Sequence, residues 1–317
     1  MTQRFSLGPL VAALVLIASL GLTALWALGA HSTYADAFSH LIGQALGGVI
    51  GGTLALVWRR RAWLVLVVVG LATVAVPAVL AWRSTVDANV RPAADEIKIV
   101  SFNTWHANLD LERLHAYIER EDADVVLLVE FGPTKRALID REKERYPYAT
   151  GCSETWECSV EILSKHPFAS TADGRRELDD GPPRVIVTFG AGPRPLTVIA
   201  AHMMRPIDGP NGHLLEMRRV AGLARSAPGP VIVAGDFNAT WWSHSFEVFR
   251  EDSGLTHMGR YLPSWPSQSR WFLPQLNIDH LWVSRELAVT DVHLGPDAGS
   301  DHRPLVAIVK LPQGLAW

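Results

Sequence analysis

The sequence predicts an α/β fold in which two packed sheets are flanked by helices and follow three membrane-spanning helices. Two observations indicate this fold. The first 82 residues contain three long apolar segments, and from residue 97 onward short apolar runs of strand length alternate with amphipathic stretches. Many strands with few helices in one region are typical of two sheets packed against each other.

The three apolar segments are residues 5–30, 38–58 and 62–82, and each has at least the roughly 20 residues that a helix needs to cross a bilayer. Two further spans follow the first one directly, so we expect an uncleaved anchor rather than a signal peptide. Gly43 and Gly47 lie four residues apart, as do Gly47 and Gly51, which favours close helix packing. The ordinary glycine content of membrane helices is the alternative explanation.

The charges beside these segments predict their orientation. Arg59–Arg61 fill the loop between the second and third spans, whereas the loop at residues 31–37 carries only Asp36. Positive loops stay in the cytoplasm. Arg83 and Arg91 oppose this orientation but are fewer. We therefore expect a multi-pass protein of the cell membrane, with everything after residue 82 on the extracytoplasmic side.

The two cysteines, Cys152 and Cys158, are six residues apart. A disulfide across this short loop would suit an oxidising compartment, and two free thiols are the alternative. The pair does not predict a structural zinc site, because such a site takes four ligands.

Residues 83–96 are polar, contain proline and lack periodicity, so we expect a linker between an anchor, residues 1–82, and an α/β domain, residues 97–317. Two amphipathic stretches of the domain predict helices, at residues 109–121 and 211–227. Its apolar runs predict eight strands, at residues 97–103, 124–130, 160–165, 184–190, 196–202, 231–238, 278–284 and 304–310.

The region after the anchor is acidic. Residues 87–317 contain 31 Asp and Glu against 24 Lys and Arg. A domain that binds nucleic acid through its phosphates normally has excess positive charge. The composition therefore disfavours nucleic acid as a partner, although a local basic groove would not alter the sum.

Polar residues stand at the ends of the predicted strands. Each has an ordinary structural explanation when taken alone, as a cap, a turn residue or a hydrogen-bonded histidine. Together they predict one shared cleft, because strand ends at one edge of a sheet lie close together. These residues are Asn103, Glu130, His202, Asp236, Asn238, Asp279, Asp301 and His302.

The segments that carry these residues, above all GDFN at 235–238 and SDHRP at 300–304, resemble the endonuclease/exonuclease/phosphatase superfamily. The resemblance covers residues 97–311 and implies a four-layered α/β sandwich that hydrolyses phosphate esters. It extends to a bacterial membrane-anchored branch that includes proteins associated with teicoplanin resistance. Two departures are the three-helix anchor and the short connection between residues 238 and 278, which leaves little room for the DNA-binding insertions of the nucleases.

Carboxylates and an amide, without a cluster of cysteine and histidine ligands, suit a hard divalent ion such as Mg²⁺ or Mn²⁺. The resemblance implies that Glu130 is its main ligand, that Asp301 reaches the ion directly or through water, and that Asn103 orients them. It also implies that Asp236 aligns or deprotonates the attacking water, while Asn238 donates its amide to a phosphate oxygen.

The resemblance gives the remaining polar residues roles in charge and proton transfer. Asp279 would fix the ring of His302, which would face the transition state as a cation. His202 is a candidate general acid or phosphate ligand. Arg205 is a candidate substrate contact, with an ordinary surface charge as the alternative.

These inferences predict a membrane-anchored phosphoesterase that uses Mg²⁺ or Mn²⁺ to cleave a phosphodiester, phosphomonoester or pyrophosphate outside the cytoplasm. Its predicted partners are the lipid bilayer and a phosphorylated substrate, for which a lipid-linked phosphate is one candidate. A tethered nuclease and a catalytically silent domain that binds phosphorylated ligands or partner proteins are the alternatives. The tryptophans of the later loops either rest on the bilayer or pack inside the domain: Trp241, Trp242, Trp265 and Trp271.

Overall fold

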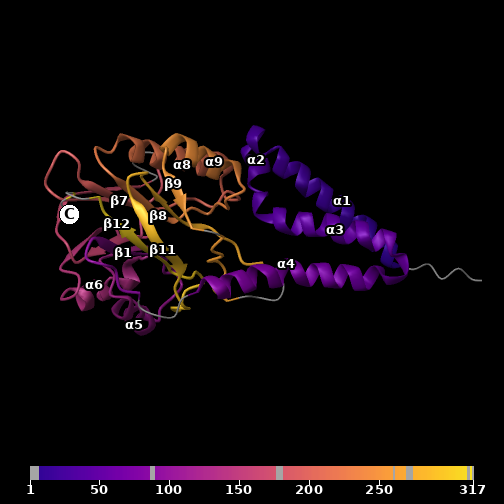
Figure 1. Cartoon of the computed structure of the whole chain (residues 1–317), viewed down its shortest axis with the longest axis horizontal. Coiled ribbons are helices and arrows are strands. Elements are labelled where there is room, and N and C mark those ends of the chain that lie inside the picture. Colours follow the sequence, from indigo (N-terminus) through magenta and orange to yellow (C-terminus); the bar gives the residue numbers. More distant parts are fainter. Residues whose placement is uncertain are drawn as a thin grey trace, which may run out of the picture.

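The computed structural model describes residues 7–85, 90–175, 181–259, 261–268, 274–312 and 315. A helical anchor and an α/β domain lie end to end (Figure 1). Three features of the sequence predictions lie outside the described residues: the start of the first span at Phe5, linker residues 86–89 and Trp271.

Three long helices form the anchor, and with the short helices that adjoin them they give three segments long and apolar enough to cross a membrane. The prediction of three apolar helices is confirmed. The long helices are α1 (Leu7–Ala27), α3 (Ile42–Val57) and α4 (Ala62–Ser84). The short ones are η1 (Gly29–His31), α2 (Thr33–Asp36), η2 (Ser39–Leu41) and η3 (Arg59–Arg61).

Glycines let α3 pack closely against α4. Gly47 faces Thr73 of α4, and Gly51 faces Val69 one turn further along. A side chain at either position would crowd α4, because a Cβ at Gly47 would come within 2.3 Å of Thr73 and one at Gly51 within 3.2 Å of Val69. Gly43 differs, because a Cβ there would meet no heavy atom of the described chain within 4 Å. The predicted glycine stripe is therefore a helix contact at two of its three positions.

The described strands of the α/β domain form two six-stranded sheets. The first sheet has the order β11-β12-β1-β2-β4-β3, and the second has the order β5-β6-β7-β8-β10-β9. The strands of the first sheet are β1 (Glu96–Asn103), β2 (Val125–Val129), β3 (Tyr148–Gly151), β4 (Val160–Ser164), β11 (Ala288–Leu294) and β12 (Leu305–Lys310). Those of the second are β5 (Phe168–Gly174), β6 (Arg184–Phe189), β7 (Leu196–His202), β8 (Val231–Asp236), β9 (Thr256–Met258) and β10 (Asp279–Val283).

Each sheet contains one parallel pair, β1 with β2 in the first and β7 with β8 in the second. The carboxyl ends of two parallel strands meet at the same edge of their sheet. Strand β10 runs antiparallel to β8, so its first residue, Asp279, pairs in register with the last residue of β8, Asp236. This topology brings polar strand ends from both sheets to one end of the domain.

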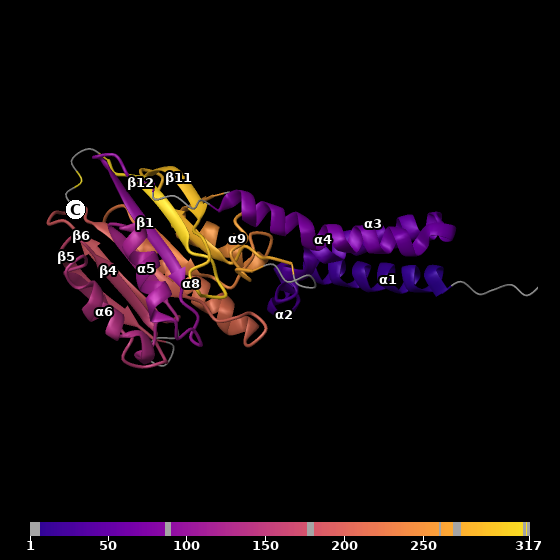
Figure 2. The same cartoon turned by 90° about the horizontal axis from the view of Figure 1, so that it is seen from below.

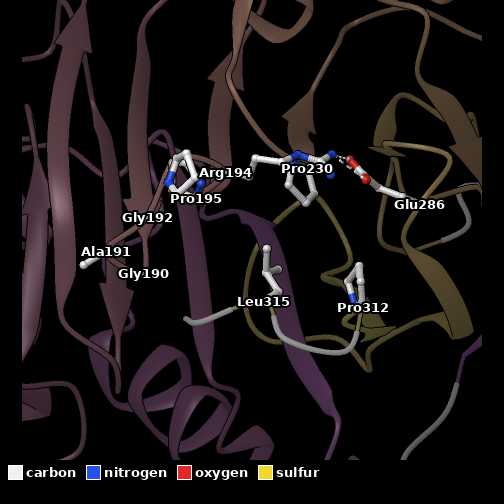
Figure 3. Close-up of a pocket in the computed structure, with 10 residues that line it drawn as sticks. Gly190, Ala191, Gly192, Arg194, Pro195, Pro230, Glu286, Pro312 and Leu315 are labelled. Atoms are coloured by element: carbon white, nitrogen blue, oxygen red, sulfur yellow. Dashed lines mark hydrogen bonds and ion pairs between the residues drawn. The ribbon is translucent and has the colours of Figure 1, made fainter.

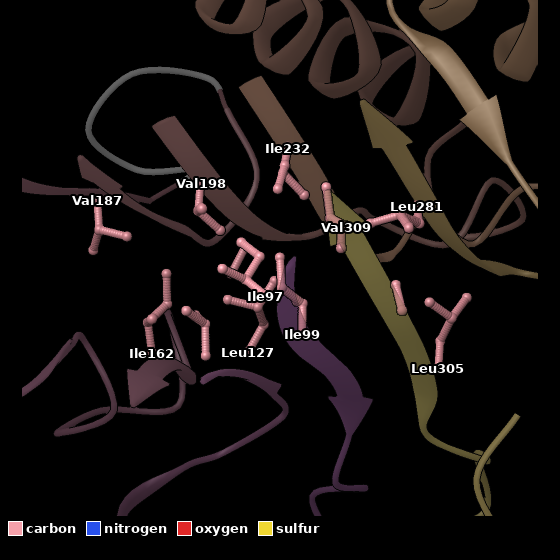
Figure 4. Packing of buried hydrophobic residues seen from close by; sticks show 14 of the residues in the cluster. Ile97, Ile99, Leu127, Ile162, Val187, Val198, Ile232, Leu281, Leu305 and Val309 are labelled. Atoms are coloured by element: carbon pink, nitrogen blue, oxygen red, sulfur yellow. The ribbon is translucent and has the colours of Figure 1, made fainter. Parts of the chain in front are cut away.

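The two sheets face each other across a core of aliphatic side chains, among them Ile99, Leu127 and Ile232 (Figure 4). Helices cover the outer face of each sheet, so the inner strands are buried on both sides and read as continuous apolar runs. The layers are therefore helix, sheet, sheet and helix, which confirms the predicted sandwich. On the first sheet the helices are α5 (Leu111–Glu121) and α6 (Ala137–Glu142), and on the second they are α8 (Pro210–Ser226) and α9 (His244–Ser253).

The eight strands that the sequence predicts are the inner strands of the two sheets, and the four that it misses are the edge strands β3, β5, β9 and β11. Strand β5 shows why, because five of its seven residues are exposed and no apolar run marks it. An edge strand is paired on one side only and is often polar. Helices α5 and α8 were predicted, whereas the short helices α6 and α9 were not.

Cys152 and Cys158 form a buried disulfide with their Cα atoms 5.5 Å apart, so the paired alternative is the one found. The predicted linker at residues 83–96 overlaps two elements. Helix α4 continues to Ser84, and β1 begins at Glu96.

The anchor contacts the α/β domain at two places (Figure 2). The segment between α1 and α3 lies against α8 and α9, on the side of the second sheet, and the end of α4 lies beside β11 of the first sheet. At the second place Thr85 bridges to Leu294 and accepts a hydrogen bond from Arg303. Helix η3, with Arg59–Arg61, lies at the opposite end of the anchor from the domain (Figure 1).

Candidate active site

The polar cluster lies where the parallel strands of both sheets end. Asn103 is the last residue of β1, and its Nδ2 atom donates to Glu130 Oε1 at 3.1 Å and to Asp236 Oδ2 at 3.0 Å. Glu130 directly follows β2, and Asp236 ends β8. One amide thus connects a carboxylate of the first sheet with a carboxylate of the second.

Three residues at this end of the domain have left-handed backbone conformations, with φ of 57° at Trp105, 52° at Glu130 and 47° at Asn238. Such conformations are uncommon outside glycine and cost roughly 1–3 kcal/mol each, so they persist only where the surroundings determine them. They concentrate at functional sites in general. The strained backbone is therefore a second, independent mark of this cluster.

His202, the last residue of β7, lies beside both carboxylates. Its Nε2 atom is 3.7 Å from Glu130 Oε1 and 3.8 Å from Asp236 Oδ2. One ligand atom of each of these three residues lies within 4.8 Å of the others, a spacing that could hold a metal ion.

Asp279 and His302 form a buried pair, with Asp279 Oδ2 2.8 Å from His302 Nδ1. The same carboxylate accepts a hydrogen bond of 2.5 Å from Ser264 Oγ. On its other side the ring lies near the cluster, since His302 Nε2 is 3.8 Å from Asp236 Oδ2. The aspartate therefore fixes the ring with Nδ1 toward itself and Nε2 toward the cluster.

The surroundings of Glu130 favour its ionised form. Burial alone would raise the pKa of this carboxyl, but the charge of His202 and hydrogen bonds from His106 and Asn103 outweigh it and lower the pKa to about 2. Glu130 is consequently an anion across the physiological pH range.

The pKa values of Asp236, in the second sheet, and of His302, in the loop before β12, are shifted the other way. Burial, reinforced by the charge of Asp279, raises the pKa of Asp236 to about 7. Burial would lower the pKa of His302, but the charge and hydrogen bond of Asp279 raise it to about 10. At neutral pH the site therefore contains a histidine cation beside a carboxyl group that can gain or lose a proton.

Asp301 has one satisfied and one unsatisfied carboxylate oxygen. Oδ2 accepts a hydrogen bond of 3.1 Å from Trp265 Nε1, whereas Oδ1 is buried and meets no donor among the described residues. The preceding residue ties this loop to β1, because Ser300 Oγ donates to the carbonyl of Asn103 at 2.7 Å. A buried carboxylate oxygen without a donor fits an ion or a water molecule.

The two predicted substrate contacts differ in their surroundings. The backbone N–H of Asn238 donates to Asp236 Oδ1 at 2.8 Å, and its Nδ2 donates to the carbonyl of Met203 at 2.9 Å. An amide nitrogen carries a second hydrogen, which a phosphate oxygen could accept. The side chain of Arg205 is 68% exposed and forms an ion pair of 2.7 Å with Asp208, which suits a surface charge. Hydrogen bonds and close ionic contacts thus connect seven of the predicted site residues, and none in the described part of the chain joins Asp301 or Arg205 to them. The seven are Asn103, Glu130, His202, Asp236, Asn238, Asp279 and His302, and their individual roles remain predictions.

Two residues that the sequence analysis did not single out support Glu130. His106 donates its backbone N–H to Glu130 Oε2 at 2.7 Å, and its Nδ1 lies 2.9 Å from the same oxygen. Lys135, in helix η4 (Pro133–Lys135), is fully buried and donates to the carbonyls of Trp105 at 2.8 Å and Glu130 at 3.1 Å. His106 could have been found from its position three residues after Asn103, but no sequence pattern marks Lys135.

The described loop tryptophans have different surroundings. Trp241 is 44% exposed. Trp242 is half-buried and donates its Nε1 hydrogen to the carbonyl of Ser39 in the anchor, at 2.7 Å. Trp265 is half-buried and holds Asp301. Trp241 is therefore the most exposed of these three and the best candidate for contact with a bilayer.

A separate hollow lies at the other end of the domain, beside the start of β7 (Figure 3). It contains an ion pair of 2.7 Å between Arg194 and Glu286. Strand β7 begins here at Leu196 and ends in the polar cluster at His202, so the hollow is distinct from the site. Its lining residues are Gly190, Ala191, Gly192, Pro193, Arg194, Pro195, Pro230, Glu286, Pro312 and Leu315.

The sequence between β1 and the start of β12 matches a known family model. The model describes the endonuclease/exonuclease/phosphatase family and matches residues 100–302. The chain belongs to this family. Membership of this family supports a phosphoester-hydrolysing enzyme. No curated protein matches the chain by sequence.

Solved structures of other proteins share the fold. The chain is similar to D. rerio TDP2 complexed with a single-strand DNA product, at 16% identity and a TM-score of 0.55, over 68% of this chain and 98% of that one. It is similar to sphingomyelinase C from Streptomyces griseocarneus, at 17% identity and a TM-score of 0.50, over 67% and 98%. It is also similar to a beta toxin variant from Staphylococcus aureus with bound magnesium ions, at 17% identity and a TM-score of 0.50, over 67% and 99%.

Proposed function

We propose that this family member is a divalent-metal-dependent phosphoesterase that acts outside the cytoplasm on phosphate groups held at the membrane surface. The observation that carries the proposal is the Asn103 amide, which joins the carboxylates of Glu130 and Asp236 beside the cation of His302. Anionic, cationic and hydrogen-bonding groups converge on one point, as the hydrolysis of a phosphate ester requires.

The residues present fit Mg²⁺ or Mn²⁺. Glu130 is ionised, since its pKa is about 2, and Asp301 offers a buried oxygen that no donor among the described residues occupies. Hard divalent ions prefer oxygen ligands of this kind. Glu130 and Asp301 would hold the ion, and Asn103 would orient Glu130. When bound, such an ion neutralises charge on the substrate phosphate and polarises its bonds.

The other residues of the cluster supply proton transfer and charge. Asp236 would align the attacking water and accept its proton on Oδ2. Asn238 would donate from Nδ2 to a phosphate oxygen. His302 would direct its positive charge from Nε2 toward the negative charge that develops on the phosphate, while Asp279 keeps the second ring proton on Nδ1.

Two observations support the extracytoplasmic side. The buried disulfide between Cys152 and Cys158 suits an oxidising compartment. Arg59–Arg61 form the turn at the end of the anchor that is remote from the domain, and positive turns face the cytoplasm. Alkaline phosphatase fused after the C-terminus should therefore be active, and a fluorescent reporter that matures only in the cytoplasm should be dark. The reverse pattern would contradict this orientation.

The position of the site next to the anchor supports a substrate at the membrane surface. The side chain of His40, which comes just before α3, lies beside the backbone of Asn238, the predicted phosphate contact. The membrane end of the domain and the catalytic end are thus the same end. A phosphate borne by a lipid would meet the site directly, whereas a long polyanion would have to approach an acidic domain next to the bilayer.

Helix α3 offers one candidate contact for a lipid chain, at Gly43. Helices α3 and α4 are in contact at Gly51 and Gly47, but α4 parts from α3 toward the domain (Figure 1). Gly43 continues the same face of α3 and has open space before it. Pro77 lies in this part of α4, where a proline is a common cause of a bend. We infer that the chain of a lipid substrate lies against α3 at Gly43 while its phosphate lies in the cluster.

Hydrolysis assays on the detergent-solubilised full chain test the proposal. At equal Mg²⁺, we expect faster hydrolysis of a polyprenyl pyrophosphate or a phospholipid than of single- or double-stranded DNA, and we expect chelation with EDTA to abolish it. Faster turnover of DNA than of every lipid would favour the tethered nuclease. Absence of hydrolysis across the panel, with either Mg²⁺ or Mn²⁺, would favour a silent domain that binds phosphorylated ligands.

A further inference from the structure

The segment between α1 and α3, residues 28–41, does more than connect two membrane helices. Its Asp36 is the single acidic residue of the first 86 residues, and the side chain is buried against the α/β domain. Asp36 Oδ1 accepts the backbone N–H of His244 at 2.6 Å, and Oδ2 accepts that of Ser245 at 2.9 Å. Both N–H groups belong to the first turn of α9, where a helix has no partners of its own.

The first turn of α9 is therefore capped from two sources. Its own N-cap residue, Ser243, accepts the N–H of Phe246 at 3.2 Å. Asp36, more than 200 residues earlier in the sequence, satisfies the two preceding N–H groups. An anionic carboxylate at a helix N-terminus is favourable because of both hydrogen bonding and the helix dipole. Without Asp36, buried backbone donors would lose their partners.

The residues just before α9 are held by the same segment. Trp242 donates its Nε1 hydrogen to the carbonyl of Ser39 at 2.7 Å, and its own carbonyl accepts from Trp26 Nε1 at 2.8 Å. The side chain of His40 lies beside the backbone of Asn238. The anchor thus contacts Asn238, Trp242 and the start of α9, which together span the loop after β8.

The opposite side of this loop rests on a histidine pair inside the domain. His280 Nε2 lies 2.8 Å from the carbonyl of Ala239, and its Nδ1 lies 3.0 Å from His257 Nε2. The loop that carries Asn238 in a left-handed conformation is therefore held between the domain interior and the anchor. A small displacement of the anchor segment would move the predicted phosphate contact directly.

We infer that Asp36 and His40 are positioning residues of the active site, so that the membrane anchor is a structural part of the catalytic centre. This inference rests on the proposed function only for its activity readout. It implies that the anchor matters even for a water-soluble substrate that needs no membrane. A tether that merely holds the enzyme at the bilayer would not affect such a substrate.

The test uses the full chain in detergent with the soluble substrate bis(p-nitrophenyl) phosphate. We expect Asp36→Ala and His40→Ala to lower kcat/KM by about tenfold, in the range typical of residues that orient catalytic groups. The Mg²⁺ concentration for half-maximal activity should stay unchanged, because neither residue contacts Glu130 or Asp301. The matched controls are His31→Ala, an exposed histidine of the same segment, and Ser32→Ala, which caps α2 within the segment. Both controls should keep wild-type activity.

A double-mutant cycle shows whether His40 acts through Asn238. In an Asn238→Ala background, His40→Ala should cost less than about twofold, because the side chain that it positions is already absent. A full tenfold cost in that background would overturn the inference, as would wild-type kcat/KM in both single variants.

Amide hydrogen exchange gives a readout that does not depend on activity. Asp36→Ala should speed exchange at His244 and Ser245, whereas Ser32→Ala should not. If the wild-type chain hydrolyses no phosphoester but this exchange difference is present, the proposed function fails and the positioning contact stands. If hydrolysis is normal and exchange at His244 and Ser245 is unaltered by Asp36→Ala, the positioning contact fails and the proposed function stands.

Discussion

The two sheets of the α/β domain have almost the same plan but contribute different groups to the site. Each has one parallel pair among antiparallel strands. At the ends of its parallel pair the first sheet carries Asn103 and Glu130, and the second carries His202 and Asp236. In our proposal the first sheet provides the ion-binding side, and the second sheet handles water and phosphate.

This difference shows why neither sheet can make the site alone. The hydrogen bond from Asn103 to Asp236 crosses from one sheet to the other. His302, in the loop before β12 of the first sheet, likewise pairs with Asp279 of the second. The site therefore forms only when the sheets pack, so the aliphatic core between them determines the spacing of the catalytic groups.

The largest expected effects come from removing one carboxylate on each side. We expect Glu130→Gln and Asp236→Asn each to lower kcat on the order of 10²–10⁴, which is the usual contribution of a positioned acid or base. Excess Mg²⁺ should restore part of the activity of Glu130→Gln, because that change weakens an ion site. It should not restore Asp236→Asn. Steady-state assays across a Mg²⁺ titration measure the difference.

Both substitutions keep the shape of the side chain, so a thermal melt within a few degrees of wild type is the control for folding. The same response to Mg²⁺ in both variants would contradict the division of roles between the sheets. Wild-type activity in either variant would contradict the site itself.

The next largest effect concerns the pair that joins the sheets. His302→Ala should lower kcat by about 10²–10³ with little change in KM, since its cation faces charge that develops in the transition state. Asp279→Asn should also lower kcat, but less strongly, because the His302 ring remains and only its pKa falls from the raised value of about 10. A rise in KM at constant kcat would instead indicate that His302 binds the ground state.

The sequence predicts the inner part of this fold and misses its borders. Inner strands such as β2 are buried on both faces, so their residues form continuous apolar runs. Edge strands such as β5 alternate or are largely exposed, and their pairing depends on a neighbour that sequence patterns do not identify. Helix α9 was missed because two of its three first-turn capping hydrogen bonds come from Asp36, far away in the chain.

The site residues also divide into those that local sequence predicts and those that depend on distant contacts. Asn103, Glu130 and Asp236 were predictable because each ends an apolar strand, a position that local sequence identifies. Lys135 was not, because its role depends on carbonyl groups that only the folded loops bring around it. Contacts between the anchor and the loop after β8 were hidden for the same reason, since they join segments about 200 residues apart in the sequence.

The comparison of the sheets extends into the anchor. The segment between α1 and α3 contacts the side of the second sheet, and α4 contacts the first sheet at β11, so the anchor touches both sheets. If a lipid chain lies against α3 at Gly43, Gly43→Leu should lower kcat/KM for a lipid substrate by about tenfold, on the order of the loss expected from filling a hydrophobic subsite. Hydrolysis of bis(p-nitrophenyl) phosphate should be unchanged.

Gly70→Leu is the matched control, because Gly70 lies in a membrane helix and also has no described atom within 4 Å of an added Cβ. It should leave both substrates unaffected. An equal loss with the lipid and the soluble substrate in Gly43→Leu would indicate a disturbed helix rather than a blocked lipid contact.

The smallest expected effect distinguishes Glu161, a buried carboxyl group of the first sheet, from Asp236, the proposed catalytic carboxyl group of the second. Glu161, in β4, is buried and accepts a hydrogen bond of 2.6 Å from Ser153 Oγ, and burial raises its pKa to about 7. Asp236 has a similar raised pKa of about 7. We expect Glu161→Gln to keep wild-type kcat, in contrast to Asp236→Asn, because Glu161 contacts no residue of the cluster in the described interactions.

Glu161 should instead affect stability in a pH-dependent way. A folded-state pKa above the unfolded value means that the folded chain binds the proton of Glu161 more tightly than the unfolded chain does. The stability that this proton contributes is therefore fully present below about pH 4.5 and is lost as pH rises through about 7. The loss is at most about 3 kcal/mol, equivalent to several degrees in Tm. Glu161→Gln removes the charge, so its Tm should match wild type at pH 4.5 and exceed it at pH 8. The exposed Glu144→Gln is the control and should show no such difference. A constant offset between Glu161→Gln and wild type at both pH values would attribute the effect to packing and not to ionisation.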